Sequence, residues 1–489
     1  MEITNVVVFT GGSQYDAMRS FGKEVAKGFS ENGVNVEILY SDDLKRYELY
    51  KRLSQADMIV SFNASGFNRL VLQEIFNRNN VVCWSFMVDH PYYHHLELYN
   101  TTYNQIVSVV DREHLEYLKR YYPHIKYKYF VPHGCAADEI MQIDFDDRTY
   151  DISFFGSYRK SEKSLEKLNE YSPNMQELLI EAVENVWDGK EQTLDNSIKD
   201  IFLKYDITDV VDSMSDIMAE FSFLDEYIRN ERRALLIRTA LKAGRKVHIF
   251  GSGWENFTSE NENNLIVHGS VDFDKSLELM ADSKIVLNNM PLFANGSHER
   301  VFSIMSSGSV CLTDSNPYLK ENFKHGEDIF YFDWLNIDDL PNLIENILNK
   351  DYDVDRIINN GRNKALSEHT WAERVKEILE YCKTIEYEKN QGLYSNAIDQ
   401  DMYALFNYIN STEADILYEQ IKGRYSWHEY YNVEYTKNLY NSMNRYRFWG
   451  SWNPEIGDYG IIKERVDVLK NHSESIKLLY ESLEDYSSK

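Results

Sequence analysis

Residues 288–314 read NNMPLFANGSHERVFSIMSSGSVCLTD, and this stretch predicts the fold of the chain. An apolar strand ends where the stretch begins, and a loop containing Gly296 follows it. Ser297 is expected to cap a helix that opens at His298, and Gly308 ends that helix before the next apolar strand. A buried strand, a loop, a capped helix and a second buried strand form the repeating unit of a parallel α/β sheet.

The same unit recurs in both directions along the chain. Short β-branched runs alternate with amphipathic helical stretches, which is typical of βαβ units. Strands are expected at 6–9, 34–40, 58–62, 81–88, 106–110 and 127–131, and again at 151–155, 246–250, 265–267, 285–288, 310–313 and 329–332. The expected fold class is therefore α/β, with two Rossmann-like doubly wound domains that face each other across a cleft at the carboxyl ends of their strands.

Breaks in the alternation divide the chain into three parts. Residues 1–149 form the first Rossmann-like domain, which ends at an acidic loop. Residues 150–388 form the second, with a strand-poor helical insertion at about 161–243. Residues 389–489 are rich in tyrosine and show no alternating strand pattern, so a small α-helical domain is expected there. Its aromatic residues suit either a carbohydrate-stacking or protein-docking surface, or the core of a helical cap.

Composition and charge exclude several functions. The chain has 489 residues and a formal net charge of −27, and such a surface repels nucleic acid phosphates and anionic lipids. Four dispersed cysteines suggest neither a disulfide framework nor a zinc site. Neither a signal peptide nor a membrane-spanning run is apparent, so we expect a soluble, cytoplasmic protein with no nucleic acid partner.

The helix start at His298 is the strongest candidate ligand site. Backbone N–H groups and the positive end of a helix dipole attract anions, and Arg300 adds a formal charge on the first turn. Together with Ser297 and Glu299 they are placed to hold a diphosphate. The alternative is an ordinary capped helix in which Arg300 pairs with a carboxylate of the protein.

Two further strand ends could approach the same ligand. Gly251 and Gly253 follow the strand at 246–250, where glycine lets backbone and ligand come close, although a tight turn explains them equally well. Trp254 comes next and could stack on a base or sugar, or pack in the core. Gly156 and Arg159 follow the strand at 151–155, and Arg159 is a candidate phosphate clamp.

The first domain offers a candidate base. Asp89 and His90 follow the apolar strand at 81–88, so a carboxylate and an imidazole are placed for proton transfer at the cleft. The alternative is that Asp89 caps the next helix and His90 lies on the rim. His90 and His94 have the spacing of a metal pair, but no third ligand lies nearby and Pro91 interrupts a helix there, so no metal site is expected.

The segment 150–333 resembles the C-terminal half of GT-B glycosyltransferases, in the group related to the spore maturation protein CgeB and the group 1 glycosyl transferases. The resemblance rests on DISFFGSYR at 151–159, RRALLIRTALKAGRKVHIFGSGW at 232–254, VHGSVDF at 267–273 with its His268, and 288–314 with its sequel YLKENFKHGEDIFYF. It implies a GT-B fold, a nucleotide-sugar donor held mainly by the second domain, an acceptor approached from the first, and a C-terminal helix that crosses back to the first domain.

One part of the family pattern is absent. Many retaining GT-B enzymes grip the donor with two glutamates separated by seven residues, and those positions fall on Asn295 and Ser303 here. Glu299 lies one turn before Ser303 on the same helix face and could take over one of these roles.

The resemblance implies a glycosyltransferase that moves a hexose or N-acetylhexosamine from a nucleotide diphosphate sugar to a hydroxyl of a glycan or protein, with no metal and no cofactor besides the donor. The alternative is a degenerate GT-B protein that binds a nucleotide sugar or glycan without turnover and acts through its helical tail. In either case, residues 389–489 are candidates for binding a protein partner or a second copy of the chain.

Overall fold

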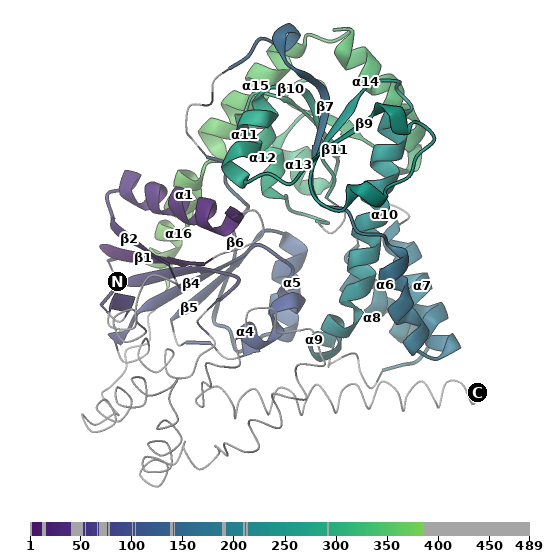
Figure 1. Ribbon diagram of the computed structural model, residues 1–489. Helices are drawn as coiled ribbons and strands as arrows, with labels where there is room; N and C mark the ends of the chain where they lie inside the picture. Colours follow the sequence, from purple (N-terminus) through teal and green to yellow (C-terminus); the bar gives the residue numbers. More distant parts are fainter. Residues whose placement is uncertain are drawn as a thin grey trace, which may run out of the picture.

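A computed structural model describes most of the chain up to residue 385 (Figure 1). The described residues are 2–385 without 12–15, 41–51, 54, 66, 68–75, 77–78, 100, 103, 137–139, 141, 188–191, 209–210, 212–213 and 291–292. The tyrosine-rich domain expected at 389–489 lies outside them.

The first domain is built on a six-stranded parallel sheet with the order β2-β1-β3-β4-β5-β6. Its strands are β1 (Asn5–Thr10), β2 (Asn35–Tyr40), β3 (Met58–Phe62), β4 (Val82–Met87), β5 (Gln105–Val109) and β6 (Tyr127–Phe130). Strands β3, β4 and β5 are buried along their whole length, as expected where helices cover both faces of a sheet. Helix α1 (Ala17–Glu31) covers one face and α5 (Arg112–Tyr121) the other.

The second domain repeats this plan with the strand order β12-β11-β10-β7-β8-β9. Its strands are β7 (Tyr150–Phe155), β8 (Val247–Phe250), β9 (Leu265–Gly269), β10 (Ser283–Leu287), β11 (Val310–Asp314) and β12 (Phe330–Phe332). Helices α11 (Phe273–Ala281) and α12 (Glu299–Ser306) pack on one face, and α10 (Ser222–Leu241) and α14 (Leu340–Leu348) on the other. The expected fold class, two Rossmann-like domains, is confirmed.

The segment expected to be a helical insertion contains α6 (Glu162–Glu166), α7 (Pro173–Trp187), α8 (Leu194–Lys204), α9 (Met214–Ile217) and the whole of α10. Figure 1 shows these helices extending from the second domain alongside α5 of the first. They share one hydrophobic core with the first domain, in which Leu178 and Phe221 of the insertion cluster with Tyr92 and Tyr117. The insertion therefore joins the two domains.

The C-terminal helices close the structure. Helices α13 (Pro317–Asn322) and α15 (Val354–Glu368) belong to the second domain, whereas α16 (Trp371–Thr384) packs against α1 of the first. Trp371, Val375 and Ile378 of α16 are buried in the core of the first sheet. The helix crossing that the resemblance implies is thus present. Within the described part of the chain, no helix combines the length and apolarity needed to span a bilayer.

Direct contacts between the domains fix the cleft. Asp111 and Gly296 form an isolated bridge, and the carboxylate of Asp111 accepts a hydrogen bond from the Asn295 N–H at 2.8 Å. The Ser20 hydroxyl of α1 donates to Asp274 of α11 at 2.7 Å. These contacts flank the carboxyl ends of both sheets and hold the two domains together at the cleft.

Candidate active site

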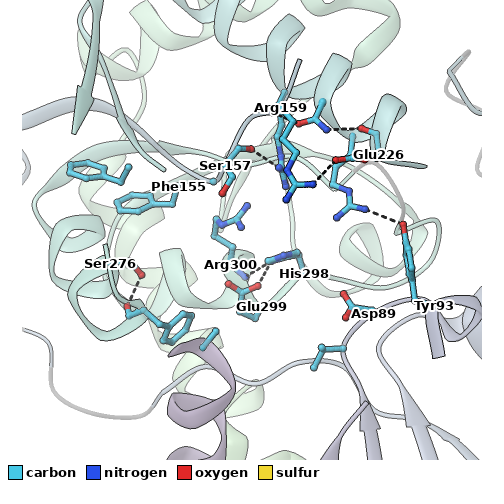
Figure 2. A pocket seen from close by; sticks show the side chains of 18 of the residues that line it. Asp89, Tyr93, Phe155, Ser157, Arg159, Glu226, Ser276, His298, Glu299 and Arg300 are labelled. Carbon is cyan, nitrogen blue, oxygen red and sulfur yellow. Dashed lines mark hydrogen bonds and ion pairs between the residues drawn. The ribbon is translucent and has the colours of Figure 1, made fainter. Parts of the chain in front are cut away.

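A cavity of about 750 Å³ lies between the two domains (Figure 2). The carboxyl ends of strands from both sheets line it, with Asp89 after β4, His133 after β6 and Gly156 after β7. The first turn of α12 lines it as well. Parallel α/β sheets bind ligands at this edge, so the cavity has the position that the fold predicts for a ligand site.

Helix α12 begins one residue later than expected. Its N-cap is His298, whose Nδ1 accepts a hydrogen bond from the Arg300 N–H at 3.2 Å, so the prediction that Ser297 caps the helix is wrong. Ser297 is fully buried outside the cavity wall, and its hydroxyl donates to the carbonyl of His298. His298, Glu299 and Arg300 all line the cavity, as predicted from the position of the helix start.

Glu299 and Arg300 carry opposite charges at this helix end. Arg300 donates to Asn288 Oδ1 at 3.1 Å, and no carboxylate among the described residues forms an ion pair with its guanidinium. Glu299 is 8% exposed and contacts the His298 ring. Burial would raise the pKa of Glu299, but His298 and Arg300 outweigh it and lower that pKa to about 2. The site therefore holds an ionised carboxylate beside the cation.

Three arginines form the wall opposite α12. Arg233 of α10 donates to the Ser157 carbonyl at 2.6 Å, Arg159 pairs with Glu226 at 3.0 Å, and Arg229 pairs with Asp225 at 3.0 Å. Figure 2 shows Arg159 above Arg300, across the open part of the cavity. In total, the cavity is lined by six cationic side chains, Arg159, Lys163, Lys167, Arg229, Arg233 and Arg300, against three carboxylates, Asp89, Glu226 and Glu299. The wall of the cavity thus carries more cations than carboxylates in a chain of net charge −27, with Lys167 and Arg229 paired to Glu220 and Asp225 behind the wall.

The sequence analysis missed Arg229 and Arg233. Both lie in the segment 161–243, which the sequence analysis describes only as a strand-poor helical insertion. They stand four residues apart and so share one face of α10. That spacing indicates a shared basic helix face in the sequence before strand β8. Only the structure shows that this face lines the cavity.

Asp89 lies in the cavity wall with its side chain 53% exposed. It accepts a hydrogen bond from Asn63 at 2.9 Å and lies 3.6 Å from His94 Nε2. Burial would raise the pKa of Asp89, but His94, Arg229 and Asn63 outweigh it and lower the pKa. Asp89 is therefore an ionised group open to a ligand, in keeping with its predicted place at the cleft.

The second predicted catalytic residue, His90, does not line the cavity. It is buried, and it caps the 3₁₀ helix η2 (Pro91–His94) by accepting a hydrogen bond from the Tyr92 N–H. Its Nε2 lies 3.4 Å from Asp195 of the insertion. His90 and His94 thus face different carboxylates, and the described residues contain no cluster of three or more His, Cys, Asp or Glu side chains that could hold a metal ion.

Gly251 and Gly253 let two loops of the second domain pack closely against each other. A Cβ on Gly251 would lie 2.0 Å from the Gly156 carbonyl oxygen, and one on Gly253 would lie 2.0 Å from that of Tyr158. The Trp254 indole donates to the same Gly156 carbonyl at 2.7 Å and is buried. These contacts hold the loop after β7, so Gly156 and Arg159 reach the cavity whereas Gly251, Gly253 and Trp254 stand behind them.

Apolar side chains form the far end of the cavity. Phe155 and Phe250 are stacked with their ring centroids 4.9 Å apart, and Met280 and Val271 lie beside them in the wall. Figure 2 shows Phe155 on one side of Arg300, with Asp89 and Tyr93 on the other. His268, another predicted ligand residue, stacks on Phe250 and bonds His248 but does not line the cavity.

The two positions of the missing glutamate pair are occupied by structural contacts. Besides its contact with Asp111, Asn295 accepts a hydrogen bond at its carbonyl from the Arg112 N–H. Ser303 is buried in α12 at 2% exposure. Glu299 is the carboxylate of this helix that lines the cavity.

Comparisons with known proteins agree with the sequence resemblance. A family model described as Glycosyl transferase-like matches residues 231–380, which include Arg233 of α10 and the whole of α12. A comparison of the chain with curated proteins found no match.

Solved structures of similar outline include three that cover 78% of this chain. Sucrose-phosphate synthase from Thermosynechococcus elongatus has 9% identity, 98% of its chain covered and a TM-score of 0.44. HepE of Anabaena in complex with UDP and glucose has 10% identity, 100% covered and a TM-score of 0.46. An alpha-glucosyltransferase in complex with UDP-glucose and DNA containing an abasic site has 10% identity, 99% covered and a TM-score of 0.46. At similarities this low, these structures decide nothing about what this chain binds.

Proposed function

We propose that the chain is a glycosyltransferase that moves a hexose or N-acetylhexosamine from a nucleotide diphosphate sugar to a hydroxyl of a glycan or protein acceptor, without a metal ion. One observation carries the proposal. The N-terminal end of α12, Arg300 and Arg233 meet in one cavity between two Rossmann-like domains, and these residues belong to the segment that matches the glycosyl transferase-like family model.

The diphosphate of the donor fits the centre of this cavity. A helix N-terminus and arginine side chains are the groups that proteins use to bind phosphate, and both lie here in a partly buried setting where their charge is weakly screened. When the bond to the sugar breaks, negative charge grows on the diphosphate. Arg300 and the arginines of α10 would stabilise that charge, which supports catalysis by electrostatics rather than by a bound metal.

The rest of the donor extends to both sides of the diphosphate. The nucleoside fits the apolar end at Phe155 and Phe250, whose aromatic faces suit a base. The sugar then lies toward the first domain, where Asp89 is the candidate base for an acceptor hydroxyl. Glu299 is ionised and can accept hydrogen bonds from hydroxyls of the ribose or the sugar, the role that the missing glutamates leave open.

Calorimetric titration with UDP, GDP and ADP tests the binding step. We expect one of them to bind, and Arg300→Ala to weaken that binding by roughly tenfold to a hundredfold, the usual value of a charge-assisted contact. The matched control is Arg245→Ala, because Arg245 pairs with Glu345 away from the cavity and its loss should leave the affinity unchanged. Unchanged affinity in Arg300→Ala would remove α12 from the donor site.

Turnover is tested separately with the matching nucleotide sugars, with and without EDTA. We expect release of the nucleoside diphosphate in the presence of glycan or protein acceptors, and the same rate in EDTA. Strict dependence on a divalent metal would contradict the proposed mechanism. Tight binding without turnover across a broad acceptor panel would favour the alternative of a degenerate binding protein.

A further inference from the structure

His133 is a buried histidine in the cavity wall that the mechanism above does not use. It follows β6 in the first domain, is 3% exposed and lines the cavity. Its Nδ1 is buried without a hydrogen-bond partner, and no described residue bonds either nitrogen of the ring. An unsatisfied buried polar atom costs free energy. Nε2, unlike Nδ1, is not among the fully buried unpartnered atoms, so it is the ring nitrogen that a ligand in the cavity can reach.

Aromatic side chains fix the position of this ring. The rings of Phe21, Phe86 and Trp371 surround it at centroid distances of 5.7, 5.6 and 6.1 Å. The backbone is held as well, because the carbonyl of His133 accepts a hydrogen bond from Arg374 at 3.0 Å and the next residue, Gly134, packs against the backbone of Trp371. The ring therefore cannot turn away to find a partner in solvent.

The position of His133 relates it to the donor site. Its ring centroid lies 6.3 Å from that of His298, the cap of α12, and the charges of Glu299 and Asp89 both act on it. Both the proposed diphosphate site and the candidate base thus lie near His133. Burial is the main cause that lowers the pKa of His133, to about 3, so the ring is neutral at neutral pH and suits hydroxyl groups better than phosphate.

We propose that His133 is a specificity-determining residue that hydrogen-bonds a hydroxyl of the transferred sugar through a ring nitrogen. This inference rests on the proposed function. A site built to bond a hydroxyl rejects analogues that lack it, because the buried polar group is then left unpaired. His133 would accordingly select donors by the hydroxyl that their sugar carries, while Arg300 and α12 bind the diphosphate common to all donors.

Three substitutions separate this role from ring packing. His133→Phe keeps a planar ring in the aromatic cage and removes both nitrogens, whereas His133→Asn and His133→Gln each keep a polar group near one nitrogen position. The affinity of each variant is measured for the nucleoside diphosphate that binds and for its glucose and N-acetylglucosamine esters. We expect His133→Phe to bind the diphosphate as the wild type does, and to bind the preferred ester roughly tenfold more weakly or worse. Either Asn or Gln should restore part of the loss.

Deoxy donors identify the hydroxyl. The wild type should lose roughly tenfold or more on the donor lacking that group, and His133→Phe should no longer discriminate against it. Phe86→Leu is the matched packing control, because Phe86 touches the His133 ring but does not line the cavity. It should lower the melting temperature and leave the ratio of ester to diphosphate affinity unchanged.

Two results would overturn the inference. One is an unchanged ratio of ester to diphosphate affinity in His133→Phe. The other is a loss of ester affinity in His133→Phe that neither His133→Asn nor His133→Gln reduces, while His133→Phe still discriminates against every deoxy donor as the wild type does. If no nucleoside diphosphate binds the wild type, the proposed function fails first, so the two failures are distinguishable.

Discussion

Asp89 is the side chain on which the chemistry can be tested most directly. Its carboxylate is ionised and lies in the cavity wall, with Asn63 and His94 on its protein side. We expect Asp89→Asn to lower kcat by roughly 10²-fold to 10⁴-fold, the usual contribution of a general base, and to leave nucleoside diphosphate affinity unchanged. Glu226→Gln is the control, since Glu226 lines the same cavity but pairs with Arg159. Full activity of Asp89→Asn would make Asp89 a structural residue.

Asp111 is a second carboxylate whose role can be measured, through the pH dependence of stability. It lies at the contact between the domains. It is fully buried and accepts hydrogen bonds from the Glu113 N–H at 2.7 Å and the Asn295 N–H at 2.8 Å. Burial raises the pKa of Asp111 from 3.8 to about 7, although those two N–H groups oppose the shift. Between these pH values the folded protein keeps a proton that the unfolded chain has lost. The contribution of Asp111 to stability is thus present at low pH and is lost as the pH rises through about 7.

The corresponding test is the pH dependence of unfolding in Asp111→Asn. The asparagine does not titrate and keeps one acceptor oxygen, so we expect a cost of about 1–3 kcal/mol at pH 5 that shrinks toward pH 8. Melting temperatures of both proteins from pH 5 to pH 8 provide the measurement. Taking the difference between the two proteins removes His133 and His369, whose pKa values burial lowers to about 3 and whose effects have the opposite sign. A difference that does not vary with pH would contradict the raised pKa of Asp111.

At the scale of elements, the sequence predicted all twelve strands within about two residues at each end. Their apolar runs are continuous because both faces are covered, as in β10, where Ile285, Val286 and Leu287 are all buried. The helix end at α12 was misjudged because Ser297 and His298 can both cap, and tertiary packing buries the serine. The insertion helices were expected, but their shared core with the first domain depends on contacts such as that of Tyr92 with Asp225, which no local pattern reveals.

The junction between β6 and α16 is packed so closely that one added atom should be costly. A Cβ on Gly134 would lie 2.7 Å from the backbone nitrogen of Trp371 and 2.9 Å from its Cα, and backbone yields poorly. We expect Gly134→Ala to destabilise the protein by about 1–3 kcal/mol through overpacking and to lower its melting temperature. In Gly22→Ala of α1, the new Cβ meets side chains rather than backbone, Thr10 at 3.2 Å and Val8 at 3.6 Å, and helix propensity offsets part of the strain. Equal melting temperatures for the two variants would show that α16 can move away from β6.

At the scale of the whole molecule, the protein is strongly negative, whereas the cavity wall carries more cations than carboxylates. The net charge of −27 repels a nucleoside diphosphate on approach, while six cationic side chains against three carboxylates attract it inside. Salt weakens both effects, since the Debye length falls from about 10 Å at 0.1 M to about 3 Å at 1 M. The attraction acts at contact distance on the bound ligand, whereas the repulsion comes from charges spread over a large surface. The attraction inside the cavity should therefore control the affinity, and the repulsion by the surface charges should control the rate of association.

This separation predicts that salt affects the affinity and the association rate constant differently. Between 50 and 500 mM NaCl, we expect nucleoside diphosphate affinity to fall by roughly threefold to tenfold while the association rate constant stays level or rises. Stopped-flow binding gives both rates, and the dissociation rate constant must then carry the whole loss. The uncharged nucleoside serves as the control and should show little salt dependence. An affinity that increases with salt would mean that the surface charge dominates, and that the arginines of α10 and α12 do not hold the diphosphate.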